Sequence, residues 1–225
     1  MILREHRGGF MNAEWSELNK KMQEQLKRNE TFQDGIATLL QLREKLLIQI
    51  AEFRVTVKPE GFQAMPFIHA NGYHNKTIAY SLYHIFRIED IVVNTLIRGS
   101  EQVFFKDHYD KRLNASIITT GNELVKQEVA DFSAKLNLEE LYCYINAVNN
   151  ETTQMLKCIH FPDLKRKTAR DKERLETLGV VSSDAAWLID YWCSKDIRGL
   201  MQMPLSRHWI MHVEASMRIQ NKIKN

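Results

Sequence analysis

The sequence predicts an all-α fold built around a helical bundle, and three observations support this prediction. The 225-residue chain contains only 9 Gly and 4 Pro, too few for the frequent turns of a β-sandwich or a β-barrel. It is 44% hydrophobic and 26% charged, which is ordinary for a globular chain. Apolar stripes recur at helical spacing along most of its length. We therefore expect a single helical domain covering 1–225, which lies within the usual size range of domains.

The sequence also indicates where in the cell the protein is located. Charged residues interrupt every apolar run, so the sequence predicts no membrane-spanning segment. The first ten residues lack the apolar core of a signal peptide, which predicts a cytoplasmic protein. The three cysteines, Cys143, Cys158 and Cys193, are odd in number and have no C-x-x-C spacing. They are expected to be reduced, buried thiols.

The first half of the chain is expected to contain three helices and one long connection. In chain order, the expected elements are an N-terminal arm at 1–11, helices at 14–28 and 32–53, a connection at 54–73 and a helix at 75–97. The helix at 32–53 has an apolar stripe, with Arg43 and Glu44 on the side expected to face solvent. Gly99 is expected to end the helix at 75–97.

The second half is expected to add one long helix and several shorter ones. In chain order, the expected helices are 102–112, 122–135 opened by Gly121-Asn122, 138–159, 185–201 capped by Ser182-Ser183-Asp184, and 205–222 opened by Pro204. Between them, the run 165–174 contains six basic residues interleaved with Asp171 and Glu173. Such mixed charge is typical of a solvated helix surface.

Two histidines in the last helix form the strongest candidate site. His208 and His212 are four residues apart, so their imidazoles lie on one helix face about one turn apart and can reach a single ion. The same face continues through Ala215, Ser216 and Ile219, which predicts that the pair points towards the interior. The motif lacks the glutamate of an H-E-x-x-H metalloprotease site. Core histidines satisfied by hydrogen bonds are the alternative interpretation.

A metal site needs a third ligand, and His84 is the candidate. It lies at the edge of the apolar stripe of the helix at 75–97, where it can face a neighbouring helix; a hydrogen-bonded boundary histidine is the alternative. Glu89 falls inside the same stripe, where an unpaired carboxylate would be costly. Its partner is expected to be the N–H of a ligating histidine, or else Arg87 or Arg207 in a buried ion pair.

Two segments of the chain resemble the DinB-like family of four-helix-bundle metalloproteins. They are 78–90, which contains His84, and 207–213, which contains His208 and His212. Members of this family typically hold a divalent ion with one histidine from the second bundle helix and two, spaced H-x-x-x-H, from the fourth. The resemblance therefore implies a DinB-like four-helix bundle whose metal ligands are these three histidines.

The resemblance carries further expectations about architecture and activity. The chain is longer than a minimal bundle of this kind, and the extra length is expected as helical insertions at 99–137 and 160–203, between bundle helices. Some members of the family are transferases or isomerases that use low-molecular-weight thiols. The resemblance also implies a homodimer and an unidentified small-molecule substrate. Outside the site, Asp90 and Glu214 are expected at the surface, and Trp209 in the core or lining a pocket.

Three neutral imidazoles leave a divalent ion with an open coordination position, as in catalytic sites. Such an ion lowers the pKa of bound water towards about 7 or polarises a substrate atom. Imidazole suits Zn, Ni and Fe alike, so the ligands do not select the metal. The sequence thus predicts a metal-dependent hydrolase or thiol-dependent transferase; the alternative is a non-catalytic helical interaction or dimerisation protein. Nucleic acid is not an expected partner, because the net charge is only +3.

Overall fold

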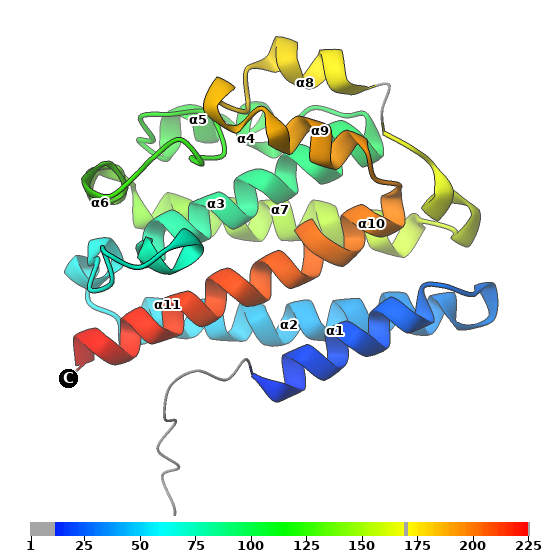
Figure 1. Cartoon of the computed structure of the whole chain (residues 1–225), viewed down its shortest axis with the longest axis horizontal. Helices are drawn as coiled ribbons and strands as arrows, with labels where there is room; N and C mark the ends of the chain where they lie inside the picture. The colour runs from blue at the N-terminus through cyan, green and yellow to red at the C-terminus, as the bar shows by residue number, and fades with distance from the viewer. Residues whose placement is uncertain (1–11, 169–170, 225) are drawn as a thin grey trace, which may run out of the picture.

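The computed structural model describes residues 12–168 and 171–224 and confirms the all-α prediction (Figure 1). Within these residues, β pairing is limited to an isolated bridge between Lys167 and Asp196. The N-terminal arm expected at 1–11 lies outside the described residues. No helix in the described part combines the length and the apolar character needed to cross a membrane.

The helices are joined by short turns and by longer connections, among them 57–77 and 113–126. The α-helices are α1 (Ala13–Gln25), α2 (Phe32–Thr56), α3 (Ile78–Asp90), α4 (Val103–Lys106), α5 (Tyr109–Arg112), α6 (Gln127–Lys135), α7 (Leu138–Cys158), α8 (Lys172–Leu178), α9 (Trp187–Cys193), α10 (Ile197–Gln202) and α11 (His208–Lys224). Two π-helical segments extend them. The segment η4 (Ile91–Arg98) continues α3, and η8 (Met203–Arg207) joins α10 to α11.

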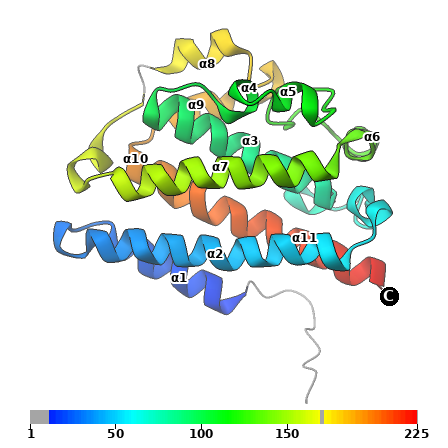
Figure 2. The same cartoon turned by 180° about the vertical axis from the view of Figure 1, so that it is seen from behind.

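Four long helical runs form the bundle: α2, α3 with η4, α7, and α10 through η8 to α11. In Figure 2, α7 and α2 lie in front of α3 and α11. The first helix, α1, packs against α2 on the outside of the bundle. The side chains of Thr77 and Asn137 cap α3 and α7 by accepting hydrogen bonds from Tyr80 N–H and Glu140 N–H. The architecture is therefore the predicted helical bundle with extra helices.

The extra helices lie between bundle helices, as predicted, but α10, within the insertion expected at 160–203, belongs to the fourth bundle run. Figures 1 and 2 both place α4, α5, α8 and α9 on the side of the bundle formed by α3 and α7, away from α1 and α2. The remaining helix of the first insertion, α6, packs against α3 at one end of the bundle. The two insertions thus thicken one side of the molecule.

Pro204 does not open the last helix, contrary to the sequence prediction. It lies inside η8, so α10 and α11 form one helical run. A proline lacks the backbone N–H, and its ring collides with the carbonyl four residues earlier in a regular α-helix. In the wider π turn, His208 N–H donates to the Met203 carbonyl instead, and Ser206 Oγ donates to the Met201 and Gln202 carbonyls.

Two other predicted helices are interrupted, and a third is shorter than predicted. The helix expected at 185–201 is divided into α9 and α10, because Asp196 adopts an extended conformation and its side chain caps the Gly199 N–H. The helix expected at 102–112 breaks at His108, which has a positive φ of 59°. The helix expected at 122–135 begins only at Gln127, so Gly121-Asn122 does not cap it.

The core is divided into two hydrophobic clusters along the bundle, with the division on α3 between Phe86 and Ile88. Close to this division, Arg43 Nη1 and Nη2 bind both carboxylate oxygens of Glu89 at 2.8 and 2.7 Å. The Arg43 guanidinium also lies 4.2 Å from the centroid of the Trp209 ring. The prediction that Arg43 faces solvent is therefore wrong: this side chain is buried at the centre of the bundle.

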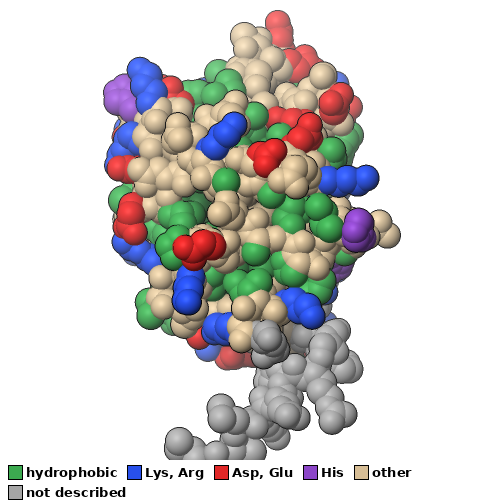
Figure 3. Space-filling view, turned by 90° about the vertical axis from the view of Figure 1, so that its left-hand side faces the viewer, with side chains coloured by type: hydrophobic (Ala, Val, Ile, Leu, Met, Phe, Trp, Pro, Cys, Tyr) green, Lys and Arg blue, Asp and Glu red, His purple; other side chains and the backbone are tan. Residues whose placement is uncertain are grey.

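The surface combines both signs of charge with scattered apolar groups. On the face shown in Figure 3, Lys and Arg side chains alternate with Asp and Glu among hydrophobic patches. The prediction of three buried cysteines holds for Cys193 only, since Cys143 and Cys158 lie on the exposed side of α7. All three are free thiols.

Candidate metal centre

Three histidines from two bundle helices meet in the interior. His84 comes from α3, and His208 and His212 come from the first two turns of α11. Their potential ligand atoms all lie within 4.8 Å of one another, and their ring centroids are 4.7–4.9 Å apart. Each side chain is buried, with at most 8% of the residue exposed. The structure therefore brings together the three residues that the sequence singled out.

The local sequence explains how each ring reaches the cluster. The i, i+4 spacing of His208 and His212 places them one above the other on the inner face of α11. The π turn that ends at Arg207 sets where α11 begins, and His208 is its first residue. On α3, the Tyr80 ring stacks against His84 with centroids 5.4 Å apart and planes 12° from parallel, which restrains the His84 ring.

Hydrogen bonding assigns the tautomer of His84. Its Nδ1 lies 2.7 Å from the backbone carbonyl of Thr120. A carbonyl only accepts, so Nδ1 must carry the proton and donate, which leaves a lone pair on Nε2. That Nε2 faces the Nε2 of His208 at 3.1 Å. His84 thus presents an unprotonated nitrogen to the other two histidines.

The donor set fits a divalent ion. Nitrogens bound to a tetrahedral zinc at about 2.0–2.1 Å lie roughly 3.3 Å apart, close to the separation of the facing nitrogens of His84 and His208. The Nδ1 atoms of His208 and His212 are buried without a hydrogen-bond partner. For His208 it is Nε2 that faces His84, so its Nδ1 lies on the other side of the ring and does not mark the position of the ion.

Burial keeps the three imidazoles neutral. It lowers the pKa of His84 to about 4, against the opposing effect of the bond to Thr120. Burial lowers the pKa values of His208 and His212 well below the usual value, with a further contribution from the neighbouring imidazoles. Neutral imidazole is the form that binds metals, so at neutral pH the three side chains are in the protonation state that can bind an ion.

These shifts predict how the metal-free protein responds to pH. Below pH 6.5 the unfolded chain takes up protons on these histidines, whereas folded His84 stays neutral until about pH 4. The free energy of unfolding is thus expected to hold its full value above pH 6.5 and to fall as the pH drops from 6.5 towards 4. Urea unfolding in the presence of a chelator measures this decline. The His208→Ala/His212→Ala variant should decline less steeply, and identical slopes would contradict the assignment.

The residues predicted to support the ligands have other roles. Glu89 has the buried partner that it requires, but the partner is Arg43 rather than a histidine, Arg87 or Arg207. Arg207 is exposed and takes no part in the cluster. Arg87 is buried, where it donates to the carbonyl of Ile118.

Two expected surface carboxylates are less exposed than predicted. Asp90 is fully buried and accepts hydrogen bonds from the backbone N–H groups of Val103 and Phe104. Glu214 is partly buried and accepts one from Asn12 N–H. The core alternative is confirmed for Trp209, which is completely buried.

Sequence reasoning missed Thr120 and Arg43. A backbone carbonyl leaves no signal in the residue type, so nothing in the sequence marks Thr120. Arg43 did have a signal, because it falls at the helical spacing of Leu39, Leu46 and Ile50 on α2. An arginine in an apolar stripe opposite a buried glutamate elsewhere in the chain predicts an internal ion pair.

Comparison with known proteins shows the fold alone. No protein-family model matches the sequence, and no curated protein matches it either. Among solved structures, the chain is similar to one described as a conserved protein of locus from Enterococcus faecalis, with a TM-score of 0.53 and 12% identity. The match covers 95% of this chain and 97% of the other. The two chains therefore share an overall helical fold.

Proposed function

We propose that the protein is a divalent-metal-dependent enzyme, a hydrolase or a thiol-dependent transferase of the DinB-like type, with its ion held by His84, His208 and His212. The observation that carries the proposal is the convergence of three buried, neutral imidazoles in the interior of the bundle. His84 also presents an unprotonated Nε2 to the Nε2 of His208 at 3.1 Å, close to the separation of two nitrogens bound to one zinc ion.

The ligand set supports catalysis better than a structural role. Structural zinc sites are closed by four protein ligands, whereas catalytic sites have three and keep one position open. In the described residues, no carboxylate or thiol joins the three histidines in the cluster. An ion held there would supply an activated water or a polarised substrate atom at the open position. The Thr120 carbonyl keeps the His84 lone pair directed at that ion.

Elemental analysis tests the proposal. Protein purified without a polyhistidine tag is expected to contain about one equivalent of Zn, Ni or Fe, as three imidazole ligands would bind. The His208→Ala/His212→Ala variant is expected to contain none, because one remaining imidazole cannot hold the ion. A His108→Ala/His160→Ala variant serves as the matched control, since both of these histidines are exposed and lie outside the cluster. Metal retained in the first variant would contradict the site.

One observation favours the alternative, a non-catalytic helical protein with core histidines. The 3.1 Å contact between the Nε2 atoms of His84 and His208 is also the length of an ordinary hydrogen bond. The two functions differ in their response to metal. An ion present at about 100 times its Kd raises the free energy of unfolding by about 2.7 kcal/mol. Under the alternative, neither added metal nor a chelator changes the melting temperature.

The proposal also covers the cellular location, the substrate and the oligomeric state of the protein. We infer a cytoplasmic protein that acts on a small molecule and associates as a homodimer. Sedimentation of the purified chain measures the last point directly. Screening the metal-loaded protein for hydrolysis and for thiol transfer identifies the substrate.

A further inference from the structure

Residues 117–121 of the first insertion lie along α3, and the carbonyl of each of them accepts a hydrogen bond from a side chain of that helix. We call residues 117–121 the carbonyl strap. Tyr80 Oη donates to the Gly121 carbonyl at 2.9 Å, His84 Nδ1 to Thr120 at 2.7 Å, Tyr83 Oη to Thr119 at 3.0 Å and to Ile117 at 3.1 Å, and Arg87 Nη2 to Ile118 at 2.7 Å. Four side chains thus reach five consecutive carbonyls, with the single hydroxyl hydrogen of Tyr83 shared between Ile117 and Thr119.

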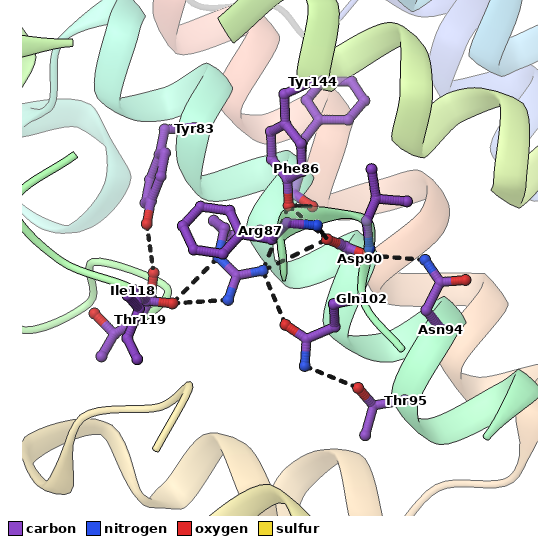
Figure 4. Close-up of polar contacts among 12 residues, drawn as sticks. Tyr83, Phe86, Arg87, Asp90, Asn94, Thr95, Gln102, Ile118, Thr119 and Tyr144 are labelled. Carbon is purple, nitrogen blue, oxygen red and sulfur yellow. Dashed lines mark hydrogen bonds and ion pairs between the residues drawn. The ribbon is translucent and has the colours of Figure 1, made fainter. Parts of the chain in front are cut away.

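The order of these bonds shows that the contact is continuous. The four donors occur at i, i+3, i+4 and i+7 on α3, so they share one face and cover about 10 Å of the helix axis. The strap runs in the opposite direction, with Gly121 at Tyr80 and Ile118 at Arg87. Figure 4 shows the end of this contact where Tyr83 and Arg87 reach the strap.

The strap has its own features that hold it against the helix. Gly121 has a φ of +79°, and a Cβ added there would lie 3.1 Å from Cε2 of Tyr80, so a larger residue would push the strap away. Thr120 is fully buried, and its hydroxyl donates to Oδ1 of Asn122. The carbonyl facing His84 therefore has little freedom to move.

Among the three histidines, only His84 has an acceptor on Nδ1, because the Nδ1 atoms of His208 and His212 have no partner. We propose that the carbonyl strap is a positioning element of the metal centre: by fixing the Thr120 carbonyl on His84 Nδ1, it directs the Nε2 lone pair towards His208 and His212. The inference rests on the proposed function for the identity of the ligand set. The proposal gives the insertion at 99–137 a role in positioning a metal ligand.

Removing one support of the strap tests this. The Tyr83→Phe variant loses the bonds to Ile117 and Thr119, on either side of Thr120, without touching a proposed ligand. Zinc affinity, measured by competition with a chromophoric chelator, is expected to fall by about tenfold or more. The matched control is Tyr142→Phe, which removes a buried bond of the same kind, from Tyr142 Oη to the Ile50 carbonyl at 3.1 Å, away from the strap. The control is expected to bind zinc as the parent does.

A second readout separates positioning from general destabilisation. Long-range ¹H–¹⁵N NMR spectra of the metal-free chain report which nitrogen of His84 carries the proton. The parent and Tyr142→Phe are expected to show the Nδ1–H tautomer, whereas Tyr83→Phe and Gly121→Ala show a mixture. Melting temperatures with a chelator present establish that each variant is folded.

The outcomes distinguish the two proposals. Parent protein that binds none of zinc, nickel and iron overturns the proposed function, and the NMR spectra still decide whether the strap sets the tautomer. Parent protein that binds zinc, with unchanged affinity and tautomer in Tyr83→Phe and Gly121→Ala, overturns the strap and leaves the proposed function standing. Equal losses of affinity in Tyr83→Phe and Tyr142→Phe would also overturn it.

Discussion

Replacing Arg43 by alanine is expected to lower the free energy of unfolding by about 3–5 kcal/mol, because it leaves the carboxylate of Glu89 buried without a counter-ion. The pair is deep in the bundle, with 2% and 0% of the two side chains exposed. Both carboxylate oxygens of Glu89 bind Arg43, and one also accepts from Thr152 Oγ1 at 2.6 Å. Equilibrium unfolding in urea measures the loss.

The effect is expected to be large because Arg43, on α2, contacts all three of the other bundle runs. From α2 it binds Glu89 on α3, Asn149 on α7 and the Leu205 carbonyl in η8, and it stacks on Trp209 of α11. The two hydrophobic clusters of the core lie on either side of this ion pair. Removing the guanidinium therefore disturbs every helix that frames the histidine cluster.

Two variants serve as controls for this prediction. Arg54→Ala removes an arginine of the same helix from an exposed pair with Glu139, and is expected to cost only about 0–1 kcal/mol. The double variant Arg43→Met/Glu89→Leu removes both charges and is expected to recover most of the stability. A single Arg43→Ala variant as stable as Arg54→Ala would show that the ion pair does not hold the bundle together.

Replacing Asp90 by alanine is the second change expected to have a large effect, again about 3–5 kcal/mol. The Asp90 carboxylate accepts hydrogen bonds from Val103 N–H, Phe104 N–H, Asn94 Nδ2 and Tyr144 Oη, at 2.7–2.9 Å. Burial raises the pKa of the Asp90 carboxyl, and the Arg87 guanidinium and the hydrogen-bond donors oppose this shift. The network is drawn in Figure 4.

The Asp90→Ala change removes more than one set of bonds. Arg87 Nη1 lies 3.6 Å from the carboxylate, so the buried guanidinium loses its counter-ion. The start of α4 loses the acceptor for two backbone N–H groups. Hydrogen exchange at Val103 and Phe104 is therefore expected to speed up together with the fall in global stability. The Asp107→Ala variant, at an exposed position just after α4, is the control, and equal losses in the two variants would contradict this role.

Much of the architecture could be predicted from the sequence because helical periodicity is a local property. The runs at 32–53, 75–97 and 138–159 match α2, α3 with η4, and α7 to within a few residues. Gly99 does end the run at 75–97, with the left-handed φ of 69° that glycine tolerates. The pairing of His208 with His212 is equally local, since it follows from the helix repeat alone.

The breaks in the helices could not be predicted from periodicity. At Asp196 the apolar spacing continues, yet the Asp196 side chain accepts a hydrogen bond from the Gly199 N–H and so caps a new helix. At Pro204 the opposite occurs, because a π turn lets the helix continue through a residue that normally starts or stops one. Both outcomes depend on a balance of local bonds that residue type does not determine.

By itself, the sequence determined the helical class, the long helices, the three candidate histidines and the need of Glu89 for a partner, because each follows from spacing along a helix or from the cost of a buried charge. Only the tertiary structure decided that this partner is Arg43, that Asp90 is buried, and that Thr120 supports His84. The physical reason is that these contacts join residues far apart in the chain: Arg43 and Glu89 are 46 residues apart, His84 and Thr120 are 36 apart, and Asp90 and Tyr144 are 54 apart. Such distant groups meet only when the bundle packs, and a backbone carbonyl carries no side-chain signature.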